Sequence, residues 1–395
     1  MAKGLFLGFP GHGHVNPTIG LIKELVSKGD TITYYCTEEF KDKILPTGAK
    51  FISYEAITVE DATEGNYINS LKHLTSICSG LLEALWKTKE DHYDYMIYDS
   101  MINIGDKIGE LLEIKSVIRS ITTFAFSNVM LENLRNHNMN MLLNFNPKEI
   151  HEVVKSIQKK YKINFLNSFI KSLTNNKANL NIVFTSKYFQ PRIEDFDESY
   201  KFIGPSIYDR KELSDFKIDN PENKKLLFIS LGTVANRNFN FYQESFKAFK
   251  NRDDLLVIMS IGKKNKISNL GEIPSNFLIY NYVPQLDLLK KVDFFITHGG
   301  MNSTSEGLYN NLPLIVVPQF GDQFIVGKRI EELKAGINLH TPNISSAEIL
   351  TAFNKISSEK YFSENAKIIG DSLREAGGYK KAVLEIHNLI KNKGL

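Results

Sequence analysis

Two histidines and two glycines follow the first apolar run of the chain, at a position suited to acid–base chemistry. Gly11-His12-Gly13-His14 follows residues 5–9, with Pro10 between them. If that run is a strand, His14 lies where open α/β sheets bind ligands, and its imidazole can accept a proton near neutral pH. Asp99 follows a later apolar run, residues 95–98, and would face the same edge of the sheet. We predict that Asp99 fixes the tautomer of His14 and balances its charge, so that the dyad activates a substrate hydroxyl.

The same loop admits two other interpretations. It begins like the dinucleotide fingerprint G-x-G-x-x-G, and Glu38 follows the second apolar run, near where an NAD-binding acid would lie. Asn16 replaces the third glycine, however, and Pro10 crowds a loop that must let pyrophosphate approach. The plainer interpretation is that His14 is a capping or loop residue. Three other histidines have no comparable context and are assigned structural roles: His12, His73 and His92.

A second constellation suits an anionic ligand. The apolar run 294–297 leads into His298-Gly299-Gly300-Met301-Asn302-Ser303 and then a helical pattern. Glycines at a helix start let backbone N–H groups reach an anion, and the helix dipole favours negative charge there. Ser230-Leu231-Gly232-Thr233 forms another turn after an apolar run. No Gly-Lys-Ser/Thr is present, so this is not a Walker loop. Together the two turns predict a diphosphate site.

Composition limits the function classes that remain. The chain has 395 residues, 42% hydrophobic and 24% charged, which is typical of globular proteins and excludes extensive disorder, collagen and coiled coil. A net charge of +3 is too small to indicate nucleic-acid binding. No apolar run approaches the ~18 residues of a membrane span, and the first run is too short for a signal peptide. Cys36 and Cys78 form neither a disulfide framework nor a metal motif, so we expect a cytoplasmic protein.

Short apolar runs alternate with helical patterns in both halves of the chain, which indicates βαβ units and parallel sheets. The predicted strands are residues 5–9, 31–36, 95–98, 117–121 and 182–185, then 226–230, 255–261, 294–297 and 314–317. In the first helix we expect Asn16 as the cap and Pro17 at the first position. Residues 124–175 carry Phe, Met and Leu among many Asn. They predict either core helices or a surface for irregular apolar ligands.

The alternation predicts two doubly wound α/β domains. Residues 1–205 form the first and residues 223–375 the second. Residues 206–222 follow Gly204 and Pro205, contain Pro221 and many charges, and are predicted to form a linker. A final helix near residues 380–391, within the segment 376–395, can pack with either domain and is assigned provisionally to the first.

The second constellation resembles the donor-binding signature of the UDP-dependent family 1 glycosyltransferases. In the order of that signature, this chain has Tyr282-Val283-Pro284-Gln285, residues 298–303, Glu306 and Asp322-Gln323, with Tyr282 where the plant family has Trp. The G-H-x-N-P, S-L-G-T, FTSKYFQP and FIGPS segments resemble the bacterial macrolide and flavonoid branch. The resemblance covers nearly the whole chain. It implies the GT-B fold, with two Rossmann-like domains facing across a cleft, the acceptor in the N-terminal domain and the donor in the C-terminal domain.

The resemblance also assigns residues to each part of a UDP-sugar. Uracil is assigned to Tyr282 and Val283; ribose to Gln285 and Glu306; the diphosphate to Gly232, Thr233, His298, Gly300, Met301, Asn302 and Ser303; and the sugar to Asp322 and Gln323. A carboxylate that accepts two O–H bonds suits the vicinal diol of ribose. An Asp-Gln pair accompanies glucose in the resembled family, whereas a His in place of the Gln accompanies galactose. Asp322 can instead serve as a helix cap.

These assignments imply an inverting glycosyltransferase that needs neither a metal nor another cofactor. His14 removes the acceptor proton, Asp99 supports it, and UDP leaves against fixed hydrogen-bond donors. We expect UDP-glucose as the donor and a hydrophobic small molecule as the acceptor: a macrolide, a flavonoid or another phenol. Two alternatives remain at this stage, a nucleotide-sugar epimerase of the same fold and a non-catalytic protein that binds sugar nucleotides.

Overall fold

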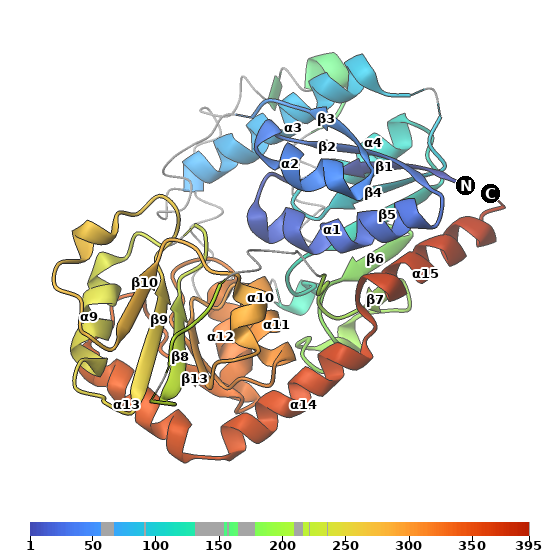
Figure 1. Ribbon diagram of the computed structural model, residues 1–395. Coiled ribbons are helices and arrows are strands. Elements are labelled where there is room, and N and C mark those ends of the chain that lie inside the picture. Colours follow the sequence, from blue (N-terminus) through green and yellow to red (C-terminus); the bar gives the residue numbers. More distant parts are fainter. Residues whose placement is uncertain are drawn as a thin grey trace. The chain divides into compact units, whose positions relative to one another are not determined.

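The computed structural model of the chain describes residues 1–56, 67–90, 92–130, 154–155, 158–164, 178–208, 216–220, 222–234 and 236–394. The helices predicted within 124–175 fall mainly outside these residues. The chain divides into two compact units. The N-terminal unit comprises Met1–Tyr208 and Ala376–Leu395, and the C-terminal unit comprises Asp209–Glu375. Both are α/β structures built on parallel sheets (Figure 1).

The described part of the N-terminal unit holds a seven-stranded sheet with the order β3-β2-β1-β4-β5-β6-β7. Its strands are β1 (Lys3–Leu7), β2 (Thr31–Cys36), β3 (Lys50–Ser53), β4 (Tyr95–Asp99), β5 (Ser116–Ile121), β6 (Leu180–Val183) and β7 (Tyr200–Phe202). Every pairing is parallel. The chain order reverses between β1 and β4, and such a switch point is where open α/β sheets bind ligands.

The helices of this unit include one from the far end of the chain. They are α1 (His12–Ser27), α2 (Lys41–Ile44), α3 (Tyr67–Thr88), α4 (Gly105–Leu111) and α15 (Gly378–Asn392), with the short 3₁₀ turns η1 (Glu38–Phe40), η2 (Leu45–Thr47) and η3 (Ile193–Asp195). Helix α15 packs against α1, β5 and β6 (Figure 1). Its His387 lies 2.9 Å from the Asp30 carboxylate, which also accepts the Tyr95 hydroxyl. The C-terminal helix is therefore part of the N-terminal unit.

The start of α1 differs from the prediction. The helix begins at His12 with Gly11 as its N-cap, so Pro17 lies inside the helix. Asn16 also lies inside the helix and does not cap it. Its side-chain oxygen accepts a hydrogen bond from the Lys43 ammonium at 2.9 Å. The strong preference of proline for the first helical turn misplaced the boundary. As a result, His14 lies in the first turn of a helix rather than in a loop.

The C-terminal unit contains a six-stranded sheet with the order β10-β9-β8-β11-β12-β13 in its described residues. The strands are β8 (Lys225–Ser230), β9 (Leu255–Ser260), β10 (Phe277–Tyr280), β11 (Phe294–Thr297), β12 (Leu314–Val316) and β13 (Gly336–Asn338). The helices are α9 (Phe239–Phe249), α10 (Gln285–Leu289), α11 (Met301–Tyr309), α12 (Gln323–Glu332), α13 (Ser346–Ser358) and α14 (Tyr361–Glu375), with the 3₁₀ turn η4 (Ile267–Leu270). The order reverses between β8 and β11, so this sheet has its own switch point.

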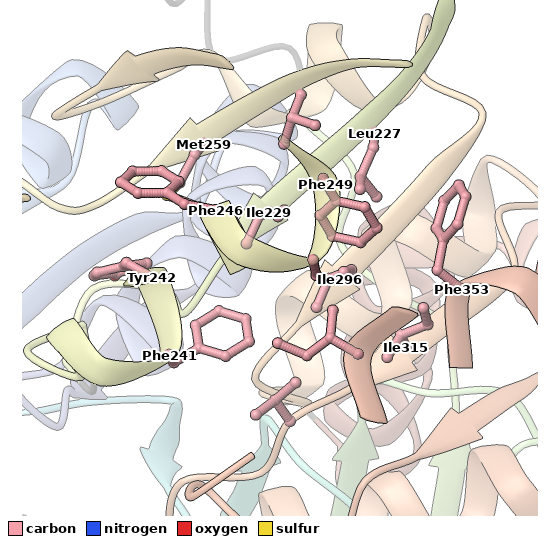
Figure 2. Close-up of a cluster of buried hydrophobic side chains, with 14 of the residues drawn as sticks. Leu227, Ile229, Phe241, Tyr242, Phe246, Phe249, Met259, Ile296, Ile315 and Phe353 are labelled. Atoms are coloured by element: carbon pink, nitrogen blue, oxygen red, sulfur yellow. The ribbon is translucent and has the colours of Figure 1, made fainter. Parts of the chain in front are cut away.

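A core rich in aromatic side chains supports the strand ends of the C-terminal unit. Figure 2 shows this cluster, in which α9 contributes Phe241, Tyr242, Phe246 and Phe249, α13 contributes Phe353, and the strands contribute Leu227, Ile229, Met259, Ile296 and Ile315. The α9 positions repeat at helical spacing, and the strand positions alternate as one face of a sheet requires. Dense packing of this kind holds the loops at the carboxyl edge on a rigid base.

In the part of the chain that the structure describes, no helix has both the length and the apolar character needed to cross a bilayer.

Candidate functional site

The N-terminal unit brings His14 and Asp99 together at its switch point. His14 lies in the first turn of α1, directly after β1, and Asp99 is the last residue of the adjacent strand β4. The Nδ1 atom of His14 lies 3.0 Å from Oδ2 of Asp99. The other carboxylate oxygen accepts the Met101 backbone N–H at 2.9 Å, which fixes the carboxylate plane. The predicted hydrogen-bond contact between the two side chains is thus confirmed.

The side chains of His14 and Asp99 differ in exposure, and so in the roles that they can have. The His14 side chain is 26% exposed, whereas that of Asp99 is 1% exposed. A ligand can therefore reach the imidazole but not the carboxylate. An ionised carboxylate at Nδ1 keeps the proton on that nitrogen, so the lone pair is on Nε2. The Phe9 ring packs beside the imidazole with a centroid separation of 4.7 Å. The geometry suits a general base next to an aromatic surface.

Three other titratable groups near Asp99 are neutral, so none of them adds a second negative charge beside its carboxylate. Burial raises the pKa of Tyr34 and of Tyr54 well above the usual range, and raises the pKa of the Cys36 thiol to about 12. The negative charge of Asp99 raises each pKa further. All three groups are consequently protonated and neutral at physiological pH.

A third side chain at this site was not predicted. Thr122 follows β5, the next strand of the sheet, and its Oγ1 atom lies 3.1 Å from Nδ1 of His14. Its position just after the predicted strand 117–121 was the signal that could have identified it. A hydroxyl at that place is common in loops, so the residue type alone did not distinguish it.

In the C-terminal unit, α11 begins as an anion site requires. Gly300 is its N-cap, no side chain caps the helix, and no acidic residue lies in its first turn. The first-turn N–H groups have no acceptor within the helix, and the dipole adds positive potential. Asn302 and Ser303 lie half-buried on this turn, while Met301 is buried. The turn thus presents backbone and side-chain donors together, as a phosphate site needs.

His298 joins this turn to the one that follows β8. A Cβ atom on Gly232 would lie 2.5 Å from Cε1 of His298, and one on Gly300 would lie 2.4 Å from its Nε2. Only glycine fits beside the ring at either position. Gly232 also has a positive φ of 74°, and exposed Thr233 follows it. The structure therefore brings the two predicted diphosphate turns into contact through one imidazole.

The electrostatic state of His298 follows from its burial. Desolvation lowers its pKa to about 4, although a hydrogen bond with the backbone carbonyl of Ser230 acts in the opposite direction. The imidazole is therefore neutral at physiological pH in the ligand-free protein. A neutral ring can take part in hydrogen bonding here, but it adds no full charge.

The residues assigned to ribose lie together. The Gln285 amide nitrogen donates to Oε2 of Glu306 at 2.6 Å and lies 3.3 Å from the Ser303 hydroxyl. Glu306 is only 4% exposed. A hydrogen bond to a carboxylate in so dry a place is stronger than one at the surface. Residues from α10 and α11 thus form one polar group beside the phosphate turn.

The residues assigned to uracil differ in accessibility. Val283 is 3% exposed, so its backbone rather than its side chain can meet a base. Tyr282 is 39% exposed, and the Lys263 ammonium lies 4.9 Å from its ring centroid. The tyrosine ring thus combines an open surface with a cation over one face.

The residues assigned to the sugar are next to each other but oriented differently. Asp322 occupies the N-cap position of α12, yet its side chain makes no capping hydrogen bond. The Gln323 carbonyl oxygen accepts the backbone N–H groups of Gln319 and Phe320 at 2.8 and 3.3 Å. The amide of Gln323 therefore uses its acceptor to hold the loop. Of the sugar contacts expected from the sequence, Gln323 can therefore make only one kind, a hydrogen bond donated by its amide N–H₂ group to a sugar hydroxyl.

Comparisons with known proteins agree with this geometry. Residues 227–375 match the family described as UDP-glucoronosyl and UDP-glucosyl transferase. The chain is 36% identical to the protein named "Uncharacterized UDP-glucosyltransferase YojK" of Bacillus subtilis, over 100% of this chain and 98% of that one. It is 33% identical to the NDP-glycosyltransferase YjiC of the same organism, over 98% and 97%. The crystal structure of the glycotransferase of kitacinnamycin has a TM-score of 0.84 and 24% identity, over 98% of each chain.

Two parallel α/β units with polar strand ends at both switch points, together with these matches, define a GT-B glycosyltransferase. The chain belongs to the family of UDP-dependent glycosyltransferases, family 1, and it is an enzyme of that family. No finding favours the dehydrogenase, epimerase or sensor interpretations.

Proposed function

We propose that this enzyme transfers glucose from UDP-glucose to a hydroxyl of a hydrophobic small molecule, with inversion at the anomeric carbon. The observation that carries the proposal is the 3.0 Å contact between Nδ1 of His14 and the buried carboxylate of Asp99. It leaves Nε2 to take the acceptor proton while Asp99 stabilises the imidazolium that forms. The freed oxygen then attacks the sugar carbon from the face opposite the diphosphate.

The donor half of the proposal rests on the C-terminal unit. Glu306 and Gln285 bind the ribose hydroxyls, and the nucleobase stacks on Tyr282 opposite Lys263. The diphosphate binds between the first turn of α11 and the Gly232–Thr233 turn, with His298 between them. Fixed backbone donors and the helix dipole stabilise the charge that builds up on the leaving UDP. The reaction on this account needs no metal ion, so EDTA should leave turnover unchanged.

The proposed preference for glucose rests on Asp322 and Gln323. The Asp322 carboxylate accepts one sugar hydroxyl, and the Gln323 amide donates to a neighbouring one, since its carbonyl already holds residues 319 and 320. A site built to bind hydroxyls discriminates strongly, because a misplaced hydroxyl leaves buried groups unpaired. Galactose, an epimer of glucose, should therefore transfer poorly.

A hydrophobic acceptor is proposed because the His14 ring packs beside the Phe9 ring. An aromatic surface next to the base suits a phenol or a macrolide better than a polar sugar.

One competition assay tests the donor and the acceptor together. The enzyme is given equal amounts of ¹³C-labelled UDP-glucose and unlabelled UDP-galactose with a panel of phenols and macrolides. The label separates glucosides from galactosides by mass, and the NMR coupling of the anomeric proton gives the configuration at that carbon. The proposal expects β-glucosides of one or more panel members. Equal incorporation of both sugars would refute the role of Asp322 and Gln323, and a retained anomeric configuration would refute the direct displacement.

A further inference from the structure

Three neighbouring strand ends supply the groups around one nitrogen of His14. The imidazole follows β1, the Asp99 carboxylate ends β4, and the Thr122 hydroxyl follows β5. Asp99 pairs with Ser120, two residues before Thr122, so the sheet holds these two oxygens near one another. They lie 3.0 and 3.1 Å from Nδ1.

We infer that Thr122 is a positioning residue for His14, and that its hydroxyl is a second acceptor for the Nδ1–H group. The inference rests on the proposed role of His14 as the general base. Nδ1 carries one hydrogen, which the ionised Asp99 keeps on that atom because a carboxylate can only accept. The threonine oxygen then offers a lone pair to the same hydrogen. Two acceptors at one nitrogen restrict rotation of the ring, and so hold Nε2 in one direction.

Burial indicates that Thr122 acts through His14. Thr122 is only 5% exposed, whereas the side chain of His14 is 26% exposed. The hydroxyl-bearing substrate can therefore contact the imidazole but not the threonine. The neighbouring Tyr34 and Cys36 of β2 are neutral, so the charge beside this hydrogen bond comes from Asp99. A hydrogen bond from imidazolium is stronger than one from neutral imidazole, so the hydroxyl also favours the ring after it has taken the proton.

The test compares Thr122→Val, which removes the hydroxyl at constant shape, with Thr122→Ser, which keeps it. For an aliphatic alcohol acceptor, Thr122→Val should lower kcat/KM about 3- to 10-fold, the effect of one neutral hydrogen bond. The acidic limb of its pH profile should move to lower pH, and Thr122→Ser should restore both. UDP affinity should not change. Thr47→Val is the matched control. Thr47 is 5% exposed, like Thr122, but its hydroxyl donates to the backbone carbonyl of Ile44 and not to a histidine. The Thr47→Val substitution should therefore leave the pH profile unchanged.

A phenol that is already ionised at the assay pH gives the second measurement. It needs no base, so Thr122→Val and wild type should turn it over equally, and a loss equal to that seen with the alcohol would overturn the inference. Thr122→Ala serves if the valine variant does not fold. In the His14→Ala background, Thr122→Val should add no further loss. If His14→Ala itself keeps wild-type turnover, the proposed base is wrong; if it loses turnover while Thr122→Val does not, only the role of Thr122 is wrong.

Discussion

Replacing Glu306 with alanine should weaken UDP binding about ten- to more than a hundred-fold. The estimate starts from the range of ~1.5–3 kcal/mol for hydrogen bonds to a charged group. The structure favours the upper part of that range. Glu306 is 4% exposed, and its Oε2 atom accepts the Gln285 amide at 2.6 Å. The substitution removes the acceptor for ribose and also leaves the Gln285 amide without the partner that orients it.

Isothermal titration with two ligands isolates the ribose contact. Wild-type protein should bind UDP more tightly than 2′-deoxy-UDP, because the deoxy sugar leaves the buried carboxylate without one hydroxyl. In Glu306→Ala the two ligands should bind with nearly equal affinity. Glu364→Ala is the control, since Glu364 is an exposed residue of α14 in the same unit. It should bind both ligands like wild type.

Two results would refute this reasoning in different ways. Unchanged UDP affinity in Glu306→Ala, with a folded protein by circular dichroism, would show that the carboxylate does not contact the nucleotide. A loss that is equal for UDP and 2′-deoxy-UDP, with their difference preserved, would show that Glu306 supports the phosphate turn of α11 rather than reading the ribose.

Three further predictions concern the two histidines. His14→Ala should lower kcat for alcohol acceptors about 10²- to 10⁴-fold, the usual contribution of a general base, with UDP affinity unchanged in titration calorimetry. Gly300→Ala should displace the His298 ring, whose Nε2 lies 2.4 Å from the added Cβ, and weaken UDP binding in titration calorimetry. His298 has a pKa of about 4, below its unfolded value of about 6.5, so the unfolded chain binds more protons between these values. Stability should therefore fall by up to about 3 kcal/mol as the pH drops through that window, and urea unfolding of His298→Gln should lack this loss.

The sequence predicted the central strands better than the edges. Residues 31–36 and 294–297 were predicted with the bounds that β2 and β11 have. Both are continuous apolar or β-branched runs, as strands buried on two faces require. Four strands were not predicted: β3, β7, β10 and β13. All four are edge strands of three or four residues. One side of each strand therefore has no neighbouring strand, and its apolar run is short.

The candidate site was predictable where backbone chemistry defines it, and less so where packing does. Glycine turns after apolar runs pointed to Gly232 and Gly300 because glycine there lets backbone N–H groups reach an anion. The commitment of the Gln323 carbonyl to its own loop was not predictable, since it depends on where residues 319 and 320 turn. Thr122 was missed for the same reason. Its role depends on the register of β4 against β5, which the sequence does not contain.

The two units use one structural device for different chemistry, and the side chains at the switch point decide which. In each sheet the chain order reverses between two adjacent strands, β1 and β4 or β8 and β11, so that two loops diverge and leave room for polar groups. In the N-terminal unit the buried Asp99 carboxylate lies there beside the partly exposed imidazole of His14, the pair that we propose as the base. In the C-terminal unit glycines lie there instead, and the imidazole between them is dry and neutral, with its pKa near 4. A carboxylate beside His298 would raise its pKa but repel a diphosphate. On the proposed function, an acidic residue in the first turn of α11 would oppose donor binding, and none lies there.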